Sequence, residues 1–373
     1  MSLKQKTITA LLWSAFERFS QQGLKLVITI ILARYLFPED YGLIGMLTVF
    51  IAIGEKFIES GFGQALIQNQ DVTHIDKCSV FYFNIGVGIL TAGLLWLLAP
   101  WIATFYNQSL LIPLTRIMSL NLVLNSLGTV QFALLTKQID FKTQAKISIL
   151  ENVISGAIGI TMAYNGYGIW SLVARSISGN FIRIVVVWIK TTWRPTWDFS
   201  LNSLQQMFGF GSRLLLSGII GALFSNIYII IIGKIFPVAV LGYYSQAKKL
   251  QQIPVKSICS MIGRVTFPVF SSIQSNKPLL KSNFRKELIS LVLIVFPLMI
   301  GIAVLAKPVI SILLTDKWLP CVPYLQLMCV IGAMLPLHVI NLNVLKALGH
   351  SDLYFKINIL KHAITIVTIC ITY

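Results

Sequence analysis

The fold of this chain is decided by residues 14–63, SAFERFSQQGLKLVITIILARYLFPEDYGLIGMLTVFIAIGEKFIESGFG, in which two apolar segments flank the acidic turn FPED at residues 37–40. Each segment is long enough to cross a bilayer as a helix. Polar residues recur in both segments at spacings of three, four or seven, which places them on one face of each helix. They are Ser14, Arg18, Gln21, Gln22, Lys25 and Thr29 in the first segment, and Thr48, Glu55 and Glu59, with Lys56 beside them, in the second.

Polar stripes within a membrane have two explanations. A charge at the bilayer centre costs at least about 2.5–3.5 kcal/mol on insertion scales, so such residues normally face water or a partner. Two helices with facing stripes therefore predict a transport cavity. The alternative is a structural ion pair, for instance of Arg18 with Glu55 or Glu59, that only holds the helices together.

The composition supports a membrane protein. Of the 373 residues, 56% are hydrophobic and only 12% are charged, against about 25% charged in an average soluble protein. Repeated apolar runs of about 20 residues predict an all-α polytopic membrane protein. The net charge of +17 does not indicate nucleic-acid binding, because the basic residues are distributed between apolar segments instead of forming one soluble patch.

The apolar runs predict eleven membrane spans. Their approximate limits are 12–35, 41–65, 79–103, 111–135, 145–164, 167–189, 206–233, 238–270, 287–306, 321–346 and 356–373. Lys and Arg concentrate in alternate loops, which predicts a cytoplasmic N-terminus by the positive-inside rule. The eighth span contains Pro254 and many charges, so we expect it to be bent or partly interfacial.

The sequence repeats itself at an offset of 200 residues. The clearest matches are Gly42 with Gly242, Lys56 with Lys256, and Gly63 with Gly263. Six spans precede the second copy, so both copies share one membrane orientation and form a parallel repeat. We expect two bundles around a central cavity, a six-helix bundle over residues 1–200 and one of about five helices over 201–373. A full second copy would end near residue 410, so we expect the second bundle to be truncated.

Eleven cations and only four acids are expected within or at the edges of the spans. A cavity lined by uncompensated Arg and Lys suits a phosphate or pyrophosphate, which Arg binds in a bidentate manner and Lys as a point charge. The alternative is that some of these cations anchor anionic lipid headgroups. For Arg183, Arg213 and Arg264, near predicted cytoplasmic ends, we expect the side chain to snorkel towards the interface.

Enzyme and cofactor motifs are missing from the sequence. There is no phosphate-binding loop, no Gly-x-Ser-x-Gly nucleophile motif, and no metal-ligand spacing among the five cysteines and four histidines. We therefore expect neither an enzyme nor a cofactor-binding protein.

Four stretches resemble a known family. They are ARYLFPEDYG at residues 33–42, ESGFGQALIQ at 59–68, FPVFSSIQ at 267–274 and LLTDKW at 313–318. The chain resembles polysaccharide exporters and lipid-linked oligosaccharide flippases of the multidrug/oligosaccharidyl-lipid/polysaccharide superfamily, including O-antigen and exopolysaccharide translocases. The resemblance implies two six-helix lobes, alternating access, a bacterial inner-membrane location and a monomer. Its implied partners are membrane lipids, a polysaccharide polymerase and a chain-length regulator.

The implied function is a flippase that moves an undecaprenyl-pyrophosphate-linked oligosaccharide from the cytoplasmic to the periplasmic leaflet. The expected pyrophosphate ligands are Arg18, Lys25, Lys56 and Lys256, with Arg116 and Arg175 extending the cationic surface. Glu17, Glu55 and Glu59 would balance charge or couple transport to an ion gradient. Three alternatives stay open: a multidrug or organic-cation antiporter, a membrane glycan polymerase or ligase, and a non-transporting assembly partner.

Overall fold

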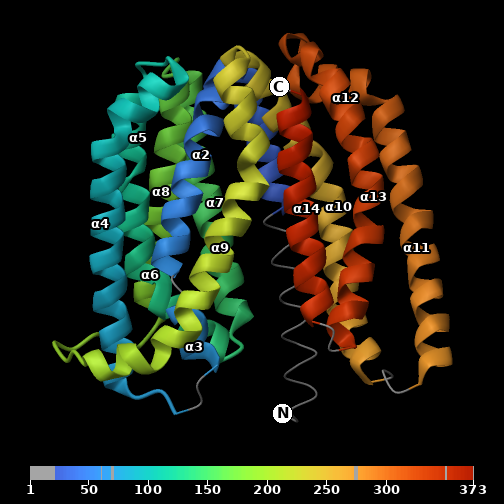
Figure 1. Cartoon of the computed structure of the whole chain (residues 1–373). Helices are drawn as coiled ribbons and strands as arrows, with labels where there is room; N and C mark the ends of the chain where they lie inside the picture. Colours follow the sequence, from blue (N-terminus) through green and yellow to red (C-terminus); the bar gives the residue numbers. More distant parts are fainter. Residues whose placement is uncertain (1–21, 60, 69–70, 273–275, 349–350, 373) are drawn as a thin grey trace. The chain divides into compact units, whose positions relative to one another are not determined.

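The computed structural model describes residues 22–372 except residues 60, 69–70, 273–275 and 349–350 (Figure 1). These residues form helices, turns and short connections without a strand, so the predicted all-α class is confirmed. A helix over residues 22–35 is followed by α2 (Pro38–Glu59), α3 (Phe62–Gln68), α4 (His74–Tyr106), α5 (Leu111–Met118), α6 (Leu120–Lys137), α7 (Phe141–Tyr164), α8 (Ile169–Lys190), α9 (Leu201–Ile235), α10 (Val238–Ser272), α11 (Lys277–Val304), α12 (Ala306–Leu314), the 3-10 helix η1 (Asp316–Cys321), α13 (Val322–Ala347) and α14 (Ser351–Thr372).

The chain divides into two compact units, Met1–Ser245 and Gln246–Tyr373. The first unit contains the helices from residue 22 to the end of α9 and the first two turns of α10. The bundles expected from the repeat, one of six helices over residues 1–200 and one of about five over 201–373, stay a prediction.

Local sequence sets where the helices start. At α2, Pro38 occupies the first helical position, where its missing N–H costs nothing, and Asp40 accepts a 2.9 Å hydrogen bond from the Phe37 backbone N–H. At α4, Thr73 and Asp76 form a reciprocal capping box. The acidic turn recognised in the sequence is thus the N-terminal cap of the second membrane helix.

In the first unit, α7 packs along α8, α2 along α9, and α4 against α6 (Figure 1). The short helix α3 is held by a buried cluster in which Phe62 and Leu66 meet Phe81 of α4 and Val130 of α6. This packing fixes α3 beside α6, which matters for the cavity described below.

In the second unit, α11 packs along α13, and α14 also contacts α13 (Figure 1). The core contains the fully buried side chains of Trp318 and Cys321 in η1 and of Leu325 in α13. At Gly332 a Cβ would lie 3.0 Å from the Gln251 side-chain carbon, so this glycine lets α10 approach α13 closely.

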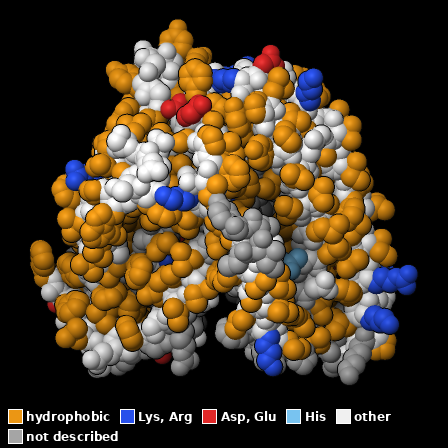
Figure 2. Space-filling model, turned by 45° about the horizontal axis from the view of Figure 1, so that its top comes forward, with side chains coloured by type: hydrophobic (Ala, Val, Ile, Leu, Met, Phe, Trp, Pro, Cys, Tyr) orange, Lys and Arg blue, Asp and Glu red, His pale blue; other side chains and the backbone are white. Residues whose placement is uncertain are grey.

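Eight helices of the described residues are long and apolar enough to cross a membrane. They are Pro38–Glu59, His74–Tyr106, Leu111–Lys137, Phe141–Tyr164, Ile169–Lys190, Leu215–Ile235, Pro278–Val304 and Asp316–Leu342. Figure 2 shows hydrophobic side chains over most of the visible surface and charged side chains singly between them. A surface of this kind suits lipid and not water, so the protein is a multi-pass membrane protein.

The other three of the eleven expected spans are also helical where they are described. The first is described from residue 22, the eighth is α10, and the last is α14, whose apolar part is only Ile359–Ile369. The helix α10 is a single 35-residue helix, and it is not among the candidate spans found in the described residues.

Candidate functional site

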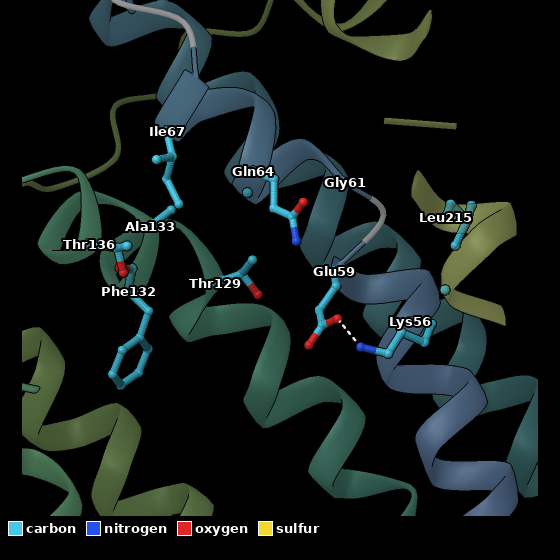
Figure 3. A pocket seen from close by; sticks show the side chains of 12 residues that line it. Lys56, Glu59, Gly61, Gln64, Ile67, Thr129, Phe132, Ala133, Thr136 and Leu215 are labelled. Carbon is cyan, nitrogen blue, oxygen red and sulfur yellow. Dashed lines mark hydrogen bonds and ion pairs between the residues drawn. The ribbon is translucent and has the colours of Figure 1, made fainter. Parts of the chain in front are cut away.

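A cavity of about 310 Å³ opens among α2, α3, α6 and α9 of the first unit (Figure 3). Its polar wall mixes one cation and one acid with amide and hydroxyl groups, and its apolar wall includes an aromatic ring and three glycines. The lining residues are Lys56, Glu59, Gly61, Gly63, Gln64, Ile67, Thr129, Phe132, Ala133, Thr136, Leu215 and Gly218.

Lys56 and Glu59 form an ion pair at the cavity wall. The Lys56 Nζ lies 2.5 Å from the Glu59 Oε2, and the two side chains are 38% and 60% exposed. Exposed pairs at this helical spacing stabilise a protein by only about 0.2–0.5 kcal/mol. A Cβ at Gly218 would lie 3.2 Å from the Lys56 Cδ, so the lysine stem runs along the bare backbone of α9.

Gly61 makes the bend from α2 to α3. Its φ of +74° is a conformation that side chains other than glycine rarely adopt. A Cβ at this position would also lie 2.6 Å from the Gly211 Cα of α9. Glycine is therefore required at this position for two reasons, the backbone conformation and the close approach of α9. The resulting bend turns Gln64 towards the space that Glu59 and Thr129 also face (Figure 3).

A second polar layer lies behind the ion pair. Glu55 accepts a 3.0 Å hydrogen bond from the Asn125 side-chain amide of α6. Arg183 of α8 places its guanidinium 4.2 Å from the centre of the Phe132 ring, a cation–π contact. Its charge acts on Glu55 and also on Glu151 of α7. Arg183 thus connects the cavity to the α7–α8 layer.

The α7–α8 layer contains a further group of charges. Glu151 interacts electrostatically with Lys25 and Arg175 as well as with Arg183. Arg175 interacts in turn with Tyr41 near the start of α2. A Cβ at Gly159 would lie 3.0 Å from the Arg175 Cβ, so this glycine lets α7 and α8 pack closely around the arginine. The described charged residues thus extend from Lys56 at the cavity, through Arg183 and Arg175 of α8, to Lys25.

A family of proteins described as polysaccharide biosynthesis proteins matches residues 31–323 of this chain. The chain belongs to this family. The match spans every residue that lines the cavity, and it confirms the resemblance drawn from the sequence stretches above.

Similar proteins include three from bacterial polysaccharide synthesis. The lipopolysaccharide biosynthesis protein WzxC of Escherichia coli (strain K12) is 29% identical over 367 residues, 97% of this chain and 74% of WzxC. The teichuronic acid biosynthesis protein TuaB of Bacillus subtilis (strain 168) is 32% identical over 315 residues, 83% of this chain and 64% of TuaB. The succinoglycan biosynthesis transport protein ExoT of Rhizobium meliloti (strain 1021) is 25% identical over 355 residues, 95% of this chain and 72% of ExoT. The chain thus spans about two thirds to three quarters of these relatives.

Solved structures of transporters share the fold. The lipid II flippase MurJ in an inward closed conformation superposes with a TM-score of 0.71 at 13% identity, covering 92% of this chain and 76% of MurJ. An inward-facing multidrug transporter of the MATE family, from the MOP superfamily, gives 0.67 at 14% identity, covering 94% of this chain and 88% of that one. At these identities the likeness establishes the fold of this polysaccharide biosynthesis family member and not its substrate.

Six of the nine expected site residues have described side chains. The structure brings Glu55, Lys56 and Glu59 together, as the helical spacing predicted. Glu17, Arg18 and the side chain of Lys256 lie outside the described residues. The suggested ion pair of Arg18 with Glu55 or Glu59 therefore also lies outside the described part of the chain.

The remaining three expected residues separate into two places. Lys25 and Arg175 share the electrostatic environment of Glu151. Arg116 lies elsewhere, on α5, with its guanidinium 4.1 Å from the centre of the Trp96 ring of α4.

Sequence reasoning missed the partners that α6 and α3 supply. Asn125, Thr129 and Gln64 carry no charge, and nothing in their spacing distinguishes them from ordinary polar residues in membrane helices. Arg183 had a signal, because it lies eight residues after Arg175 and so near the same face of α8. That it snorkels towards the interface stays a prediction, and the structure places its guanidinium over the Phe132 ring.

Proposed function

We propose that this protein is a flippase that moves undecaprenyl-pyrophosphate-linked oligosaccharide units from the cytoplasmic to the periplasmic leaflet of the bacterial inner membrane. The observation that carries the proposal is a series of cations inside a helical membrane bundle, one of which lines an open cavity. Relatives named as biosynthesis and transport proteins support a transporter and not an enzyme.

The described cations suit the pyrophosphate part of such a substrate. Lys56 lies at the cavity wall, and Lys25 and Arg175 of the same unit both act on Glu151. A charge in a membrane costs several kcal/mol, so a protein that keeps more cations than acids there has a use for them. Arg18 and Lys256 stay predicted pyrophosphate ligands, and Arg116, which lies against Trp96, stays a predicted extension of the cationic set.

Glu55, Glu59 and Glu17 are proposed to balance these charges or to couple transport to an ion gradient. Glu55 is held by Asn125, whereas Glu59 is exposed and pairs with Lys56. In the orientation that we propose, with a cytoplasmic N-terminus, the C-terminal end of α2 and the cavity beside it lie on the cytoplasmic side, where the substrate is made.

The charge of this site argues against an organic-cation antiporter. Among the residues that the structure describes, four cations, namely Lys25, Lys56, Arg175 and Arg183, accompany three acids, namely Glu55, Glu59 and Glu151. A cation exporter requires the opposite excess, since its ligand must find a net negative environment.

The lipid-linked oligosaccharide pool of a strain lacking this gene tests the proposal. We expect undecaprenyl-linked units to accumulate on the cytoplasmic leaflet and the surface polysaccharide to disappear. Units that reach the periplasmic leaflet but stay unpolymerised would instead identify a polymerase. Unchanged pools in both leaflets would contradict the proposal.

A further inference from the structure

The cavity combines two kinds of wall that a saccharide requires. Gln64 and Thr129 offer an amide and a hydroxyl towards the same space (Figure 3). Ile67, Phe132 and Ala133 supply apolar surface beside them. Sugars have polar hydroxyl edges and apolar C–H faces, so such a mixed lining suits them better than it suits a purely apolar or purely ionic ligand.

The two threonine hydroxyls at this wall differ in how many hydrogen bonds they can still form with a ligand. The Thr136 hydroxyl already donates to the Phe132 carbonyl at 2.8 Å and accepts from the Gln144 amide at 3.1 Å. The Thr129 hydroxyl donates to the Asn125 carbonyl at 3.1 Å, which leaves its oxygen able to accept. Thr129, together with the exposed amide of Gln64, is therefore better able than Thr136 to bind a ligand.

Glu59 is the acid at the cavity that a bound anion would displace from Lys56. Glu55 is engaged by Asn125, so Glu59 is the carboxylate that occupies Lys56 in the described part of the cavity. Their pair is exposed and therefore weak. The pyrophosphate group of the substrate as a whole has two negative charges and four non-bridging acceptor oxygens, against one charge and two oxygens on a carboxylate, so it would compete with Glu59 for the Lys56 ammonium.

We propose that this cavity is the subsite for the sugar phosphate at the reducing end of the lipid-linked substrate. The phosphate replaces Glu59 on Lys56, and the first sugar hydrogen-bonds to Gln64 and Thr129. A volume of about 310 Å³, at the low end of small-molecule sites, holds one sugar with its phosphate and not a whole oligosaccharide. This inference rests on the proposed function and adds the ligand class of the subsite and a role for Glu59 as a displaceable counter-ion.

Binding to the full-length chain in phosphatidylcholine nanodiscs tests the proposal with two probes. One is farnesyl pyrophosphate, and the other is the same molecule with a glucose attached to its pyrophosphate. Glu59→Gln should lower the Kd of both probes about two- to five-fold, because Lys56 loses its resident partner. Lys56→Met should raise both Kd values about 10- to 100-fold.

The sugar contacts are tested by the difference between the probes. Gln64→Leu and Thr129→Val should each raise the Kd of the glycosylated probe about three- to ten-fold and leave farnesyl pyrophosphate unchanged. Glu39→Gln is the matched control, since it removes the same charge from the other end of α2 at an exposed position. It should change neither Kd.

The outcomes separate this inference from the proposed function. Wild-type protein that binds neither probe would overturn both. Wild-type binding with no tightening in Glu59→Gln, or with equal losses for both probes in Gln64→Leu, would overturn the subsite alone. Equal competition by phosphatidylglycerol would also overturn the subsite, because the phosphate recognised would then be a bulk-lipid headgroup.

Discussion

Gly42 and Gly242 make reciprocal backbone contacts where the starts of α2 and α10 cross within the first unit. A Cβ at Gly242 would lie 2.7 Å from the carbonyl carbon of Pro38, and one at Gly42 would lie 2.9 Å from that of Val238. The two glycines are equivalent positions of the 200-residue repeat. Because each meets backbone, neither contact can be relieved by rotating a side chain.

This relationship predicts that Gly42→Ala and Gly242→Ala each destabilise the protein by about 1–3 kcal/mol, the usual cost of overpacking. The midpoint of thermal unfolding in detergent measures the effect. Gly93→Ala and Gly221→Ala are matched controls, since no atom lies within 4 Å of a Cβ at either position. They should be neutral or stabilise by up to about 1 kcal/mol, because alanine favours the helix. Equal midpoints in all four variants would refute the crossing.

At the bend between α2 and α3, Gly61→Ala should lower the free energy of unfolding by more than the strain of a left-handed backbone conformation alone explains. Gly166 has a similar φ, +80° against +74°, but no atom near its Cβ position. Gly166→Ala should therefore lose only about 1–2 kcal/mol of backbone strain. Gly61→Ala adds a clash with Gly211 worth about 1–3 kcal/mol. Chemical unfolding of the two variants compares them, and equal losses would contradict the close approach of α9.

The proposed function predicts that charge reversal at Lys25 abolishes export while the protein still inserts. Lys25→Glu would place a second acid beside Glu151 and remove a cation from the proposed path. We expect export of surface polysaccharide to fall at least about 100-fold, as for loss of a charged contact. Lys307→Glu, an exposed reversal on α12, is the control. Membrane fractions should contain equal amounts of both variants, and normal export by Lys25→Glu would remove this residue from the site.

The cation–π contact between Arg116 and Trp96 predicts an energetic coupling in protein stability, which can be measured without substrate. Arg116→Met and Trp96→Leu should show a coupling energy of about 0.5–2 kcal/mol in a double-mutant cycle of unfolding free energies. Additive losses would mean that the cation–π contact contributes nothing. Export measured in the same variants shows whether Arg116 also serves the proposed pyrophosphate surface.

Much of the architecture could be predicted from the chain itself. Apolar runs long enough for a bilayer predicted the helices, because backbone groups in lipid must be satisfied within each helix. Polar spacing of three and four placed Glu55 and Glu59 on one face of α2 with Lys56 beside them. The FPED stretch was predicted only as the turn between the first two helices, whereas the structure begins α2 at Pro38, since proline and an acid suit the first turn of a helix.

The site itself depends on contacts between segments far apart in the sequence, and these are set by packing. Thr129 and Gln64 meet Lys56 only because Phe62 and Leu66 anchor α3 against α4 and α6. No local periodicity encodes such a meeting, since it depends on which helix faces fit together. The same holds for Arg183, whose position over Phe132 is decided by the packing of α8 against α6. The charged residues of the site could therefore be identified from the sequence, whereas the residues that contact them are determined by the packing of the helices.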